Sequence, residues 1–241
     1  LEGKSEWALD AANKMSKQVN HKGMLVPELA TLQHYYSIPY FVMVKFGKWE
    51  EILKMPAVDT SLIYPGGIRH YARGMAYVGL KDLEKAKIEL NELKAVASME
   101  TLKTLTIWEI NSLHTVADIA QKVLEGEILA AEGKSAESIS LLKQAVALED
   151  QLNYNEPPDW FFSVRHHLGA VLLSNNQPDE AIKVYLEDLA RFPKNGWALS
   201  GLKQAYLNSR QSVKEDETEA RFKEAWAHAD VKLKGSKVES E

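Results

Sequence analysis

The chain of 241 residues contains no cysteine, which excludes disulfide bonds and thiol chemistry and leaves the compartment open between cytoplasm and periplasm. No apolar run reaches the roughly 18 residues of a membrane-spanning helix. The longest, residues 25–44, is interrupted by Pro27, Glu28, His34 and Pro39. A basic excess is also absent, since 29 Lys and Arg face 34 Asp and Glu for a net charge of -5. The sequence therefore predicts neither a membrane span nor a nucleic-acid partner.

Local catalytic motifs are missing as well. There is no HExxH pair, no glycine-rich phosphate loop after a strand and no nucleophile elbow around a serine. His166 and His167 are adjacent, so on a helix they point in different directions. We therefore expect no cofactor and no catalytic residue, and an enzyme is the less favoured class.

One segment of the chain, residues 165–193, has an interpretable pattern. Gly169 and Ala181 are small enough for two helices to cross closely, and Tyr185 is large enough to fill the space beside that crossing. Pro193 ends the second helix because it has no N–H to donate. With Leu168 before the glycine, these spacings match one tetratricopeptide repeat, a helix–turn–helix unit of about 34 residues.

The same template recurs along the chain. The positions equivalent to that glycine are separated by 34, 52, 43 and 32 residues, and they are Tyr40, Gly74, Gly126, Gly169 and Gly201. The two long intervals indicate insertions, one at about 97–112 that extends helices or adds a short one, and one that includes an ordered loop at 153–159. We predict an all-α, right-handed α-solenoid of antiparallel helix pairs. Its single domain spans 1–230, with about five repeats at 27–55, 67–98, 119–150, 160–193 and 195–230.

The two ends depart from the repeat. Residues 5–19 look like a second helix whose partner first helix is missing, and the chain starts at Leu1. We therefore expect that further repeats precede it and that the face of Trp7, Leu9 and Met15 is partly uncovered. Residues 231–241 are polar without periodicity, which predicts a frayed tail.

Several blocks resemble a particular group within the tetratricopeptide-repeat superfamily. KFGKWEEIL, LEDQLNYNEPPDWFFSVRHHLGAVLL, YLEDLARFPKNGWALSGLKQAY and FKEAWAHAD are similar to the C-terminal half of large, mostly bacterial proteins of this kind. The likeness covers Phe46 to Asp230. It implies the architecture, and it supplies no catalytic residues because members of that group have no assigned activity.

The first helix of each repeat should line the concave side of the superhelix. Helical periodicity places one stripe of residues inward, and its members are His34, Ser37, Phe41, Val44, Ile68, Tyr71, Met75, Val78, Ala120, Val123, Glu127, Ala130, Ser163, His166, Ala170, Leu173, Asn195, Ala198, Leu202 and Ala205. The candidate ligand groove drawn from these and from the 153–159 loop comprises His34, Phe41, Tyr71, Met75, Glu127, Glu156, Arg165 and His166. The aliphatic members of the stripe are equally explained by helix packing.

This mainly apolar groove favours a non-catalytic scaffold that binds a protein or peptide. The inward Lys and Arg that grip a C-terminal carboxylate in co-chaperone repeats are absent. One alternative is a metal-dependent or hydrolytic enzyme using His34, His70, Glu127 and His166. Another is a structural subunit whose groove packs on its own missing N-terminal repeats.

The 153–159 loop has two interpretations. In the structural one, Asp159 caps the next helix and Trp160 packs beneath the loop. In the functional one, Glu156 and Arg165 point into the groove and fix a polar group of a ligand. Proline–aromatic clusters pack more often than they catalyse, so we favour the structural interpretation.

Overall fold

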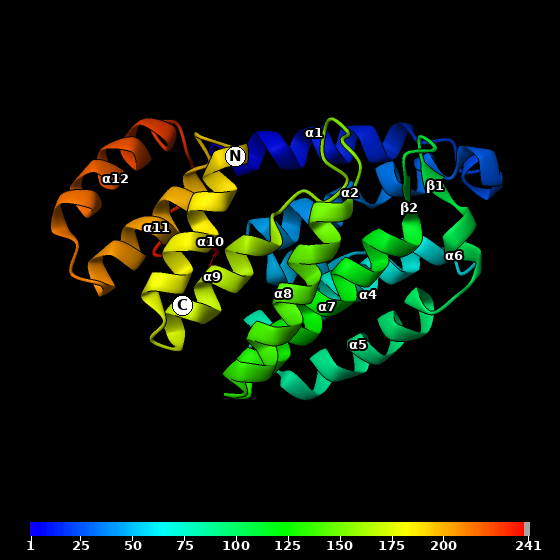
Figure 1. Ribbon diagram of the computed structural model, residues 1–241. Helices are drawn as coiled ribbons and strands as arrows, with labels where there is room; N and C mark the ends of the chain where they lie inside the picture. Colours follow the sequence, from blue (N-terminus) through cyan, green and yellow to red (C-terminus); the bar gives the residue numbers. More distant parts are fainter. Residues whose placement is uncertain (239–241) are drawn as a thin grey trace.

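The computed structural model describes residues 1–238, and within them the chain forms twelve α-helices and almost no sheet. The helices follow one another as antiparallel pairs (Figure 1). Their bounds are α1 Ser5–Gln18, α2 Thr31–Lys45, α3 Trp49–Lys54, α4 Ile63–Gly79, α5 Leu83–Ala97, α6 Thr101–Thr104, α7 Leu113–Ala131, α8 Ser135–Gln151, α9 Val164–Ser174, α10 Pro178–Arg191, α11 Gly196–Asn208 and α12 Ser212–Ala225. Two short 3₁₀ turns, Gly23–Leu25 and Pro27–Leu29, precede α2. The all-α repeat architecture is confirmed.

The first helices of the repeats, α2, α4, α7, α9 and α11, form the inner layer, and the second helices cover them. Inner helices are buried on most sides: α7 buries ten residues, from Leu113 to Ile128. Outer helices bury one stripe and expose the rest, as α10 does with Ala181, Tyr185, Asp188 and Leu189. This difference in burial is what stacked repeats require, because each inner helix contacts both of its neighbours.

Glycines mark the close crossings between helices. A Cβ on Gly126 of α7 would stand 2.8 Å from Leu142 of α8, its own repeat partner. A Cβ on Gly74 would instead overlap Leu124 of α7, in the following repeat. The small positions therefore serve contacts within one repeat and between neighbouring repeats.

The two insertions bind each other. The first contains the short helix α6, as expected, and also a two-residue antiparallel ladder that the sequence did not indicate, β1 Thr106–Ile107 with β2 Asn111–Ser112. Asn111 Nδ2 donates to Asp159 Oδ2 at 2.7 Å, and the Asn153 N–H donates to Asn111 Oδ1 at 2.8 Å. Asp159 therefore ties the loop to the ladder. It does not cap the next helix; the side chain of Ser163 does so.

Helix α1 lies along one side of the array, with its start beside the end of the last repeat (Figure 1). It packs on α2, and its N-terminal N–H groups at Ser5 and Glu6 donate to the carboxylate of Asp230 at 2.7 and 3.0 Å. Trp7 on its outer face is 76% exposed. The first and last elements of the described chain are thus joined.

The frayed tail predicted for 231–241 is wrong for the part that the structure describes. Val231 and Leu233 are partly buried against Phe46, Phe162 and Trp197, while Lys232 and Lys234 are exposed. Ser236 is buried, with 1% of its surface accessible. Residues 239–241 lie outside the described residues. The alternation of Val231, Lys232, Leu233 and Lys234 is a period-two signal typical of an extended segment with one packed face.

Candidate functional site

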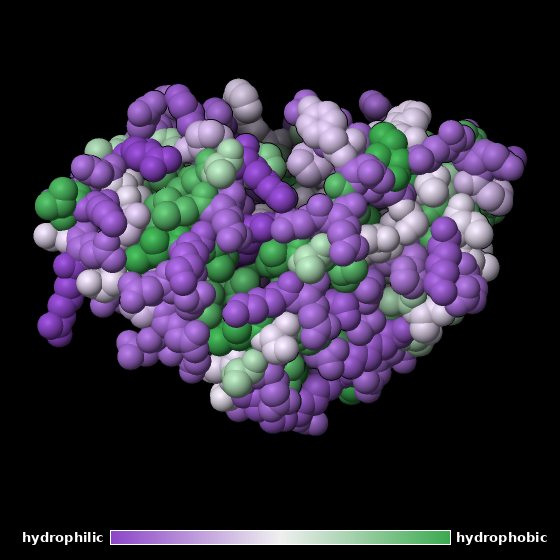
Figure 2. Space-filling view, in the orientation of Figure 1, coloured by the Kyte–Doolittle hydropathy of each residue, from purple (hydrophilic) through white to green (hydrophobic). Residues whose placement is uncertain are grey.

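A cavity of about 510 Å³ opens on the inner helices. The predicted inward stripe contributes to its wall from four successive repeats, through Val44, Met75, Val78, Glu127, Ala130 and Ala170. Trp49, Phe162 and His167 add aromatic surface. Figure 2 shows one face of the molecule, which is largely hydrophilic, with hydrophobic side chains gathered at its middle and over α10 and α11. The cavity wall is thus mainly apolar and drawn from neighbouring repeats.

Glu127 is the buried charge of this cavity, with 4% of its surface accessible. His167 Nδ1 donates to its Oε1 at 2.7 Å, and Lys237 Nζ donates to its Oε2 at 2.6 Å. Burial raises the pKa of Glu127, but the Lys237 charge and the His167 hydrogen bond outweigh it and hold the pKa at about 2. The carboxylate stays ionised because cationic and N–H groups surround it.

The other ring nitrogen of His167, Nε2, is buried with no hydrogen-bond partner among residues 1–238. His167 follows His166 on α9, and the inward stripe predicted from the sequence includes His166 but not His167. The adjacent positions do point apart: His167 lines the cavity with Glu127, whereas His166 does not. No signal in a single sequence distinguishes the two, because each is surrounded by hydrophobic residues.

The C-terminal segment occupies part of the groove. Ser236 Oγ donates to the backbone carbonyl of His166 at 2.6 Å and lies 2.8 Å from the hydroxyl of Tyr185. Val238 packs against Gly47, where an added Cβ would be 2.6 Å from its Cγ1. Lys237 and Val238 themselves line the cavity. The C-terminal segment therefore fills one part of the groove around Glu127, and the rest of the groove is open.

Three predicted groove residues are covered by Trp160 and Phe161, which directly follow the 153–159 loop. Trp160 packs edge-on against Phe41, with ring centroids 5.5 Å apart, and also against Tyr71. Phe161 stacks on His34 at 5.9 Å with nearly parallel rings. His34, Phe41 and Tyr71 are each 5% exposed or less. This part of the inner surface is filled, and only Met75 and Glu127 of the candidate set line the cavity.

A second cavity, of about 910 Å³, lies under the 153–159 loop. Glu156 and His166 of the candidate set line it, together with Lys45 and Glu149. Burial lowers the pKa of Lys45 to about 8 and raises that of Glu149 to about 7. Lys45 lines both cavities, and its ammonium lies over the rings of Phe162 and Trp197. The ammonium of Lys45, in cation–π contact with these two rings, therefore borders both cavities.

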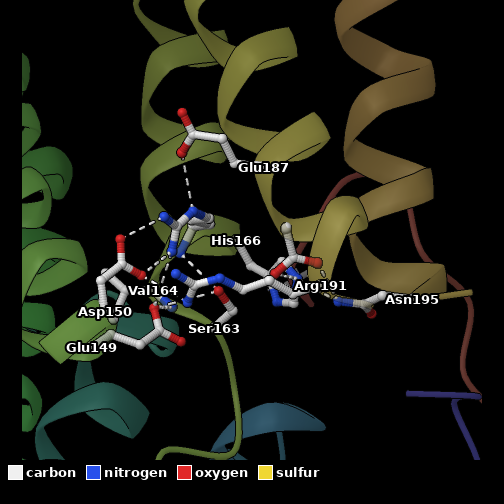
Figure 3. Close-up of polar contacts among 10 residues, drawn as sticks. Glu149, Asp150, Ser163, Val164, His166, Glu187, Arg191 and Asn195 are labelled. Carbon is white, nitrogen blue, oxygen red and sulfur yellow. Dashed lines mark hydrogen bonds and ion pairs between the residues drawn. The ribbon is translucent and has the colours of Figure 1, made fainter. Parts of the chain in front are cut away.

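Arg165 lines neither cavity. Its guanidinium binds Asp150 through two hydrogen bonds of 2.8 Å, and its Nε donates to Glu187 at 3.2 Å. Figure 3 shows this cluster of charged groups where α8, α9 and α10 meet, with Glu149 beside Asp150 and Asn195 near His166. The bidentate pair joins two repeats. Arg165 therefore has its hydrogen-bonding groups engaged by the scaffold, which does not favour a ligand role.

The four residues of the metal-site alternative lie in separate interactions. His34 Nδ1 is 2.9 Å from the hydroxyl of Tyr64, His70 Nδ1 is 2.6 Å from Glu89, and Glu127 pairs with His167. His166 Nε2 lies 2.9 Å from Asn195 Nδ2 and 3.5 Å from Asp188. Across residues 1–238 no group of three or more His, Asp and Glu side chains is arranged to hold a metal ion.

None of the helices within residues 1–238 combines the length and hydrophobicity needed to cross a bilayer. Residues 69–98, which comprise most of α4 and all of α5, match the tetratricopeptide repeat family model. No curated protein and no solved structure gives a significant match. The match over residues 69–98 identifies a tetratricopeptide repeat there, and the paired-helix architecture of the rest of the described chain agrees with this repeat family.

Proposed function

We propose that this protein is a non-catalytic scaffold that binds a protein or peptide segment in the groove around Glu127. The observation that carries the proposal is the composition of the 510 Å³ cavity, whose wall takes apolar residues from α2, α4, α7 and α9 in succession. An extended peptide laid across these helices would contact one repeat after another. Apolar contacts with a few buried polar groups supply affinity and register in this kind of recognition.

The buried polar groups of the groove suit binding better than catalysis. Glu127 is held by a histidine and a lysine, and its pKa of about 2 is far below the range of a general base that works near neutral pH. His167 is oriented by Glu127, but no serine or threonine hydroxyl is hydrogen-bonded to it in the described chain. The arrangement fixes a charge in an apolar groove, which gives specificity to a binding site.

Peptide selection with matched variants tests the proposal. The wild-type chain would select ligands from a displayed peptide library, and the affinity of each synthetic ligand would be measured by fluorescence anisotropy. Ala170→Arg places a large side chain in the half-buried cavity wall, so we expect at least about tenfold weaker binding, the effect of losing one important contact.

Ala136→Arg is the control because Ala136 is exposed on the outer helix α8. It makes the same substitution outside both cavities, and the selected peptides should bind it as they bind the wild type. If Ala170→Arg retains full affinity for every selected ligand, the groove is not the binding surface.

A further inference from the structure

The last described segment of the chain makes side-chain contacts with the groove and few backbone contacts. Residues 232–238 form no backbone hydrogen bond within the described chain. At the preceding residue, the Val231 carbonyl accepts a hydrogen bond from the Trp226 indole N–H at 2.7 Å. They have no regular secondary structure. The segment is therefore held by its side chains: Val231 and Leu233 pack against the neighbouring aromatic cluster, and Ser236, Lys237 and Val238 contact the groove.

Each of these three side chains meets a distinct feature of the groove. The Ser236 hydroxyl lies between the His166 carbonyl and the Tyr185 hydroxyl, both within 2.8 Å. The Lys237 ammonium binds the buried carboxylate of Glu127. Val238 packs with the apolar group of Phe46, Phe162 and Trp197. A hydroxyl, a cation and an aliphatic group are thus bound in consecutive order.

The buried carboxylate of Glu127 is stabilised by a nearby cation, whether this chain or a partner supplies it. Glu127 is 5% exposed at its side chain, whereas Lys237 is 27% exposed. Leaving a buried carboxylate without its cation is strongly unfavourable, because desolvation is then uncompensated. An incoming segment with a lysine at this position would restore the pair, and one with an acidic residue there would be repelled.

Beside the tail the groove remains open. The cavity that Lys237 and Val238 line still holds about 510 Å³ of free space, reaching Met75, Ala130 and Ala170. The tail therefore fills the polar end of the site and leaves the apolar end accessible. A partner segment that reproduces the serine, lysine and aliphatic contacts and extends into this space would make contacts that the tail does not.

We propose that this groove recognises a short extended partner segment of the form serine–lysine–aliphatic, and that residues 236–238 are a resident copy of that motif which the partner displaces. This rests on the proposed binding function and specifies its ligand. A tethered copy acts at an effective concentration on the order of millimolar, so a free peptide of equal intrinsic affinity would bind the intact chain only in that range. Weakening the tail should expose the intrinsic affinity.

The test uses the full chain and a fluorescein-labelled peptide with the sequence of residues 231–238, VKLKGSKV. In the variant Ser236→Ala with Lys237→Ala, the tail loses its hydroxyl and its cation, and we expect the peptide to bind at least tenfold more tightly than it binds the wild type. Adding Glu127→Gln should remove that gain. The peptide VKLKGSEV, which has glutamate in place of the lysine that corresponds to Lys237, should bind at least tenfold more weakly than VKLKGSKV.

Methyl NMR on the wild-type chain, with ¹³C-labelled valine, keeps the proposal testable if the tail variant does not fold. Excess unlabelled VKLKGSKV should move the Val238 methyl resonances, which arise from a side chain packed in the groove, toward their random-coil positions as it displaces the segment, and VKLKGSEV should not. Unchanged Val238 resonances at saturating peptide, or equal affinity for both peptides, overturns the proposal. A concentration-dependent dimer that the tail variant abolishes would assign the groove to the tail of a second copy and also overturns it.

The experiments distinguish a failure of the proposed peptide motif from a failure of the proposed groove-binding function. If VKLKGSKV does not bind while library-selected peptides remain sensitive to Ala170→Arg, the motif is wrong and the groove function stands. If Ala170→Arg has no effect on any selected peptide, the groove function itself is wrong.

Discussion

The ring of Tyr185 in α10 lies directly against the backbone of Gly169 in α9, and a Cβ built on Gly169 would overlap it. The same ring meets Gly201 of α11, so one tyrosine fills the space between three helices. Tyr185 is fully buried, and its hydroxyl is engaged by Ser236. The tyrosine therefore has little room to move away from an added methyl group.

We expect Gly169→Ala to lower the free energy of unfolding by about 2–3 kcal/mol, since over-packing a buried crossing forces neighbouring side chains to shift. Urea denaturation followed by far-UV circular dichroism measures this. Gly66→Ala is the matched control, because Gly66 lies within α4 and a Cβ there meets nothing within 4 Å. Alanine favours helix over glycine by up to about 1 kcal/mol, so the control should be neutral or stabilising. Equal destabilisation by both changes would contradict this account of the crossing.

The repeat pattern could be predicted from sequence because its positions are set by local sterics. Gly126, Gly169 and Gly201 are small for a reason that depends only on the helix pair that each one joins, and their spacing repeats along the chain. The position of Trp160 has no such periodic signal. Its contacts with Phe41 and Tyr71 come from helices more than 80 residues earlier in the chain, and only the folded superhelix brings them together.

The candidate site was predictable in part for the same reason. Helical periodicity placed Met75, Glu127 and Ala170 on one inner stripe, and they share a cavity. It could not show that Phe161, just after the 153–159 loop, covers His34 in the neighbouring part of that stripe. Nor could it place Lys237, which reaches Glu127 across 110 positions of sequence.

Asp230 caps α1 from the far end of the chain by accepting from the N–H groups of Ser5 and Glu6. We expect Asp230→Ala to cost about 1–2 kcal/mol of unfolding free energy, the typical effect of losing a helix N-cap. Amide hydrogen exchange should accelerate first in α1. Asp10→Ala is the control, because Asp10 makes only an exposed pair with Lys14 on the same helix. Unchanged exchange in α1 of the Asp230 variant would show that the cap does not hold the two ends together.

Glu127 should make the protein sensitive to acid. Its pKa is about 2 in the folded chain against an ordinary 4.5, so the unfolded chain takes up the proton first as the pH falls. The stability that the ionised carboxylate contributes is present above pH 4.5 and is lost as the pH falls toward 2. The full difference is about 3 kcal/mol at most, measured as urea unfolding free energy between pH 6 and pH 2.5.

Glu127→Gln should remove this part of the pH dependence, because the amide does not titrate. Glu84→Gln on the exposed face of α5 serves as the control and should follow the wild-type profile. A Glu127→Gln profile parallel to the wild type over this range would mean that the carboxylate is not held by Lys237 and His167 in solution.

Glu149 should have the opposite effect at higher pH. Burial raises its pKa from 4.5 to about 7, and the Val164 N–H, which donates to it at 3.0 Å, does not offset this. Between pH 4.5 and 7 the unfolded chain releases the proton while the folded chain retains it, so stability falls as the pH rises through this window and then levels off. Glu149→Gln keeps an oxygen for the Val164 N–H and removes the charge. We therefore expect it to unfold with wild-type free energy near pH 4 and to be more stable than the wild type at pH 8, by on the order of 3 kcal/mol.

The neighbouring Asp150 provides the contrast for that experiment. Asp150 accepts both hydrogen bonds of the buried Arg165 guanidinium, and Arg165 holds the pKa of Asp150 below its ordinary value. Asp150→Asn leaves that cation without its main counter-charge, so it should destabilise the chain at pH 8, where Glu149→Gln stabilises it. The two substitutions would then change the unfolding free energy at pH 8 in opposite directions. The reason is the surroundings of each carboxylate, since Asp150 pairs with a guanidinium and burial disfavours the charge of Glu149. If both variants are destabilised at pH 8, Glu149 is ionised and paired in the folded protein, and Arg165 lies closer to it than the 4.0 Å of the structure.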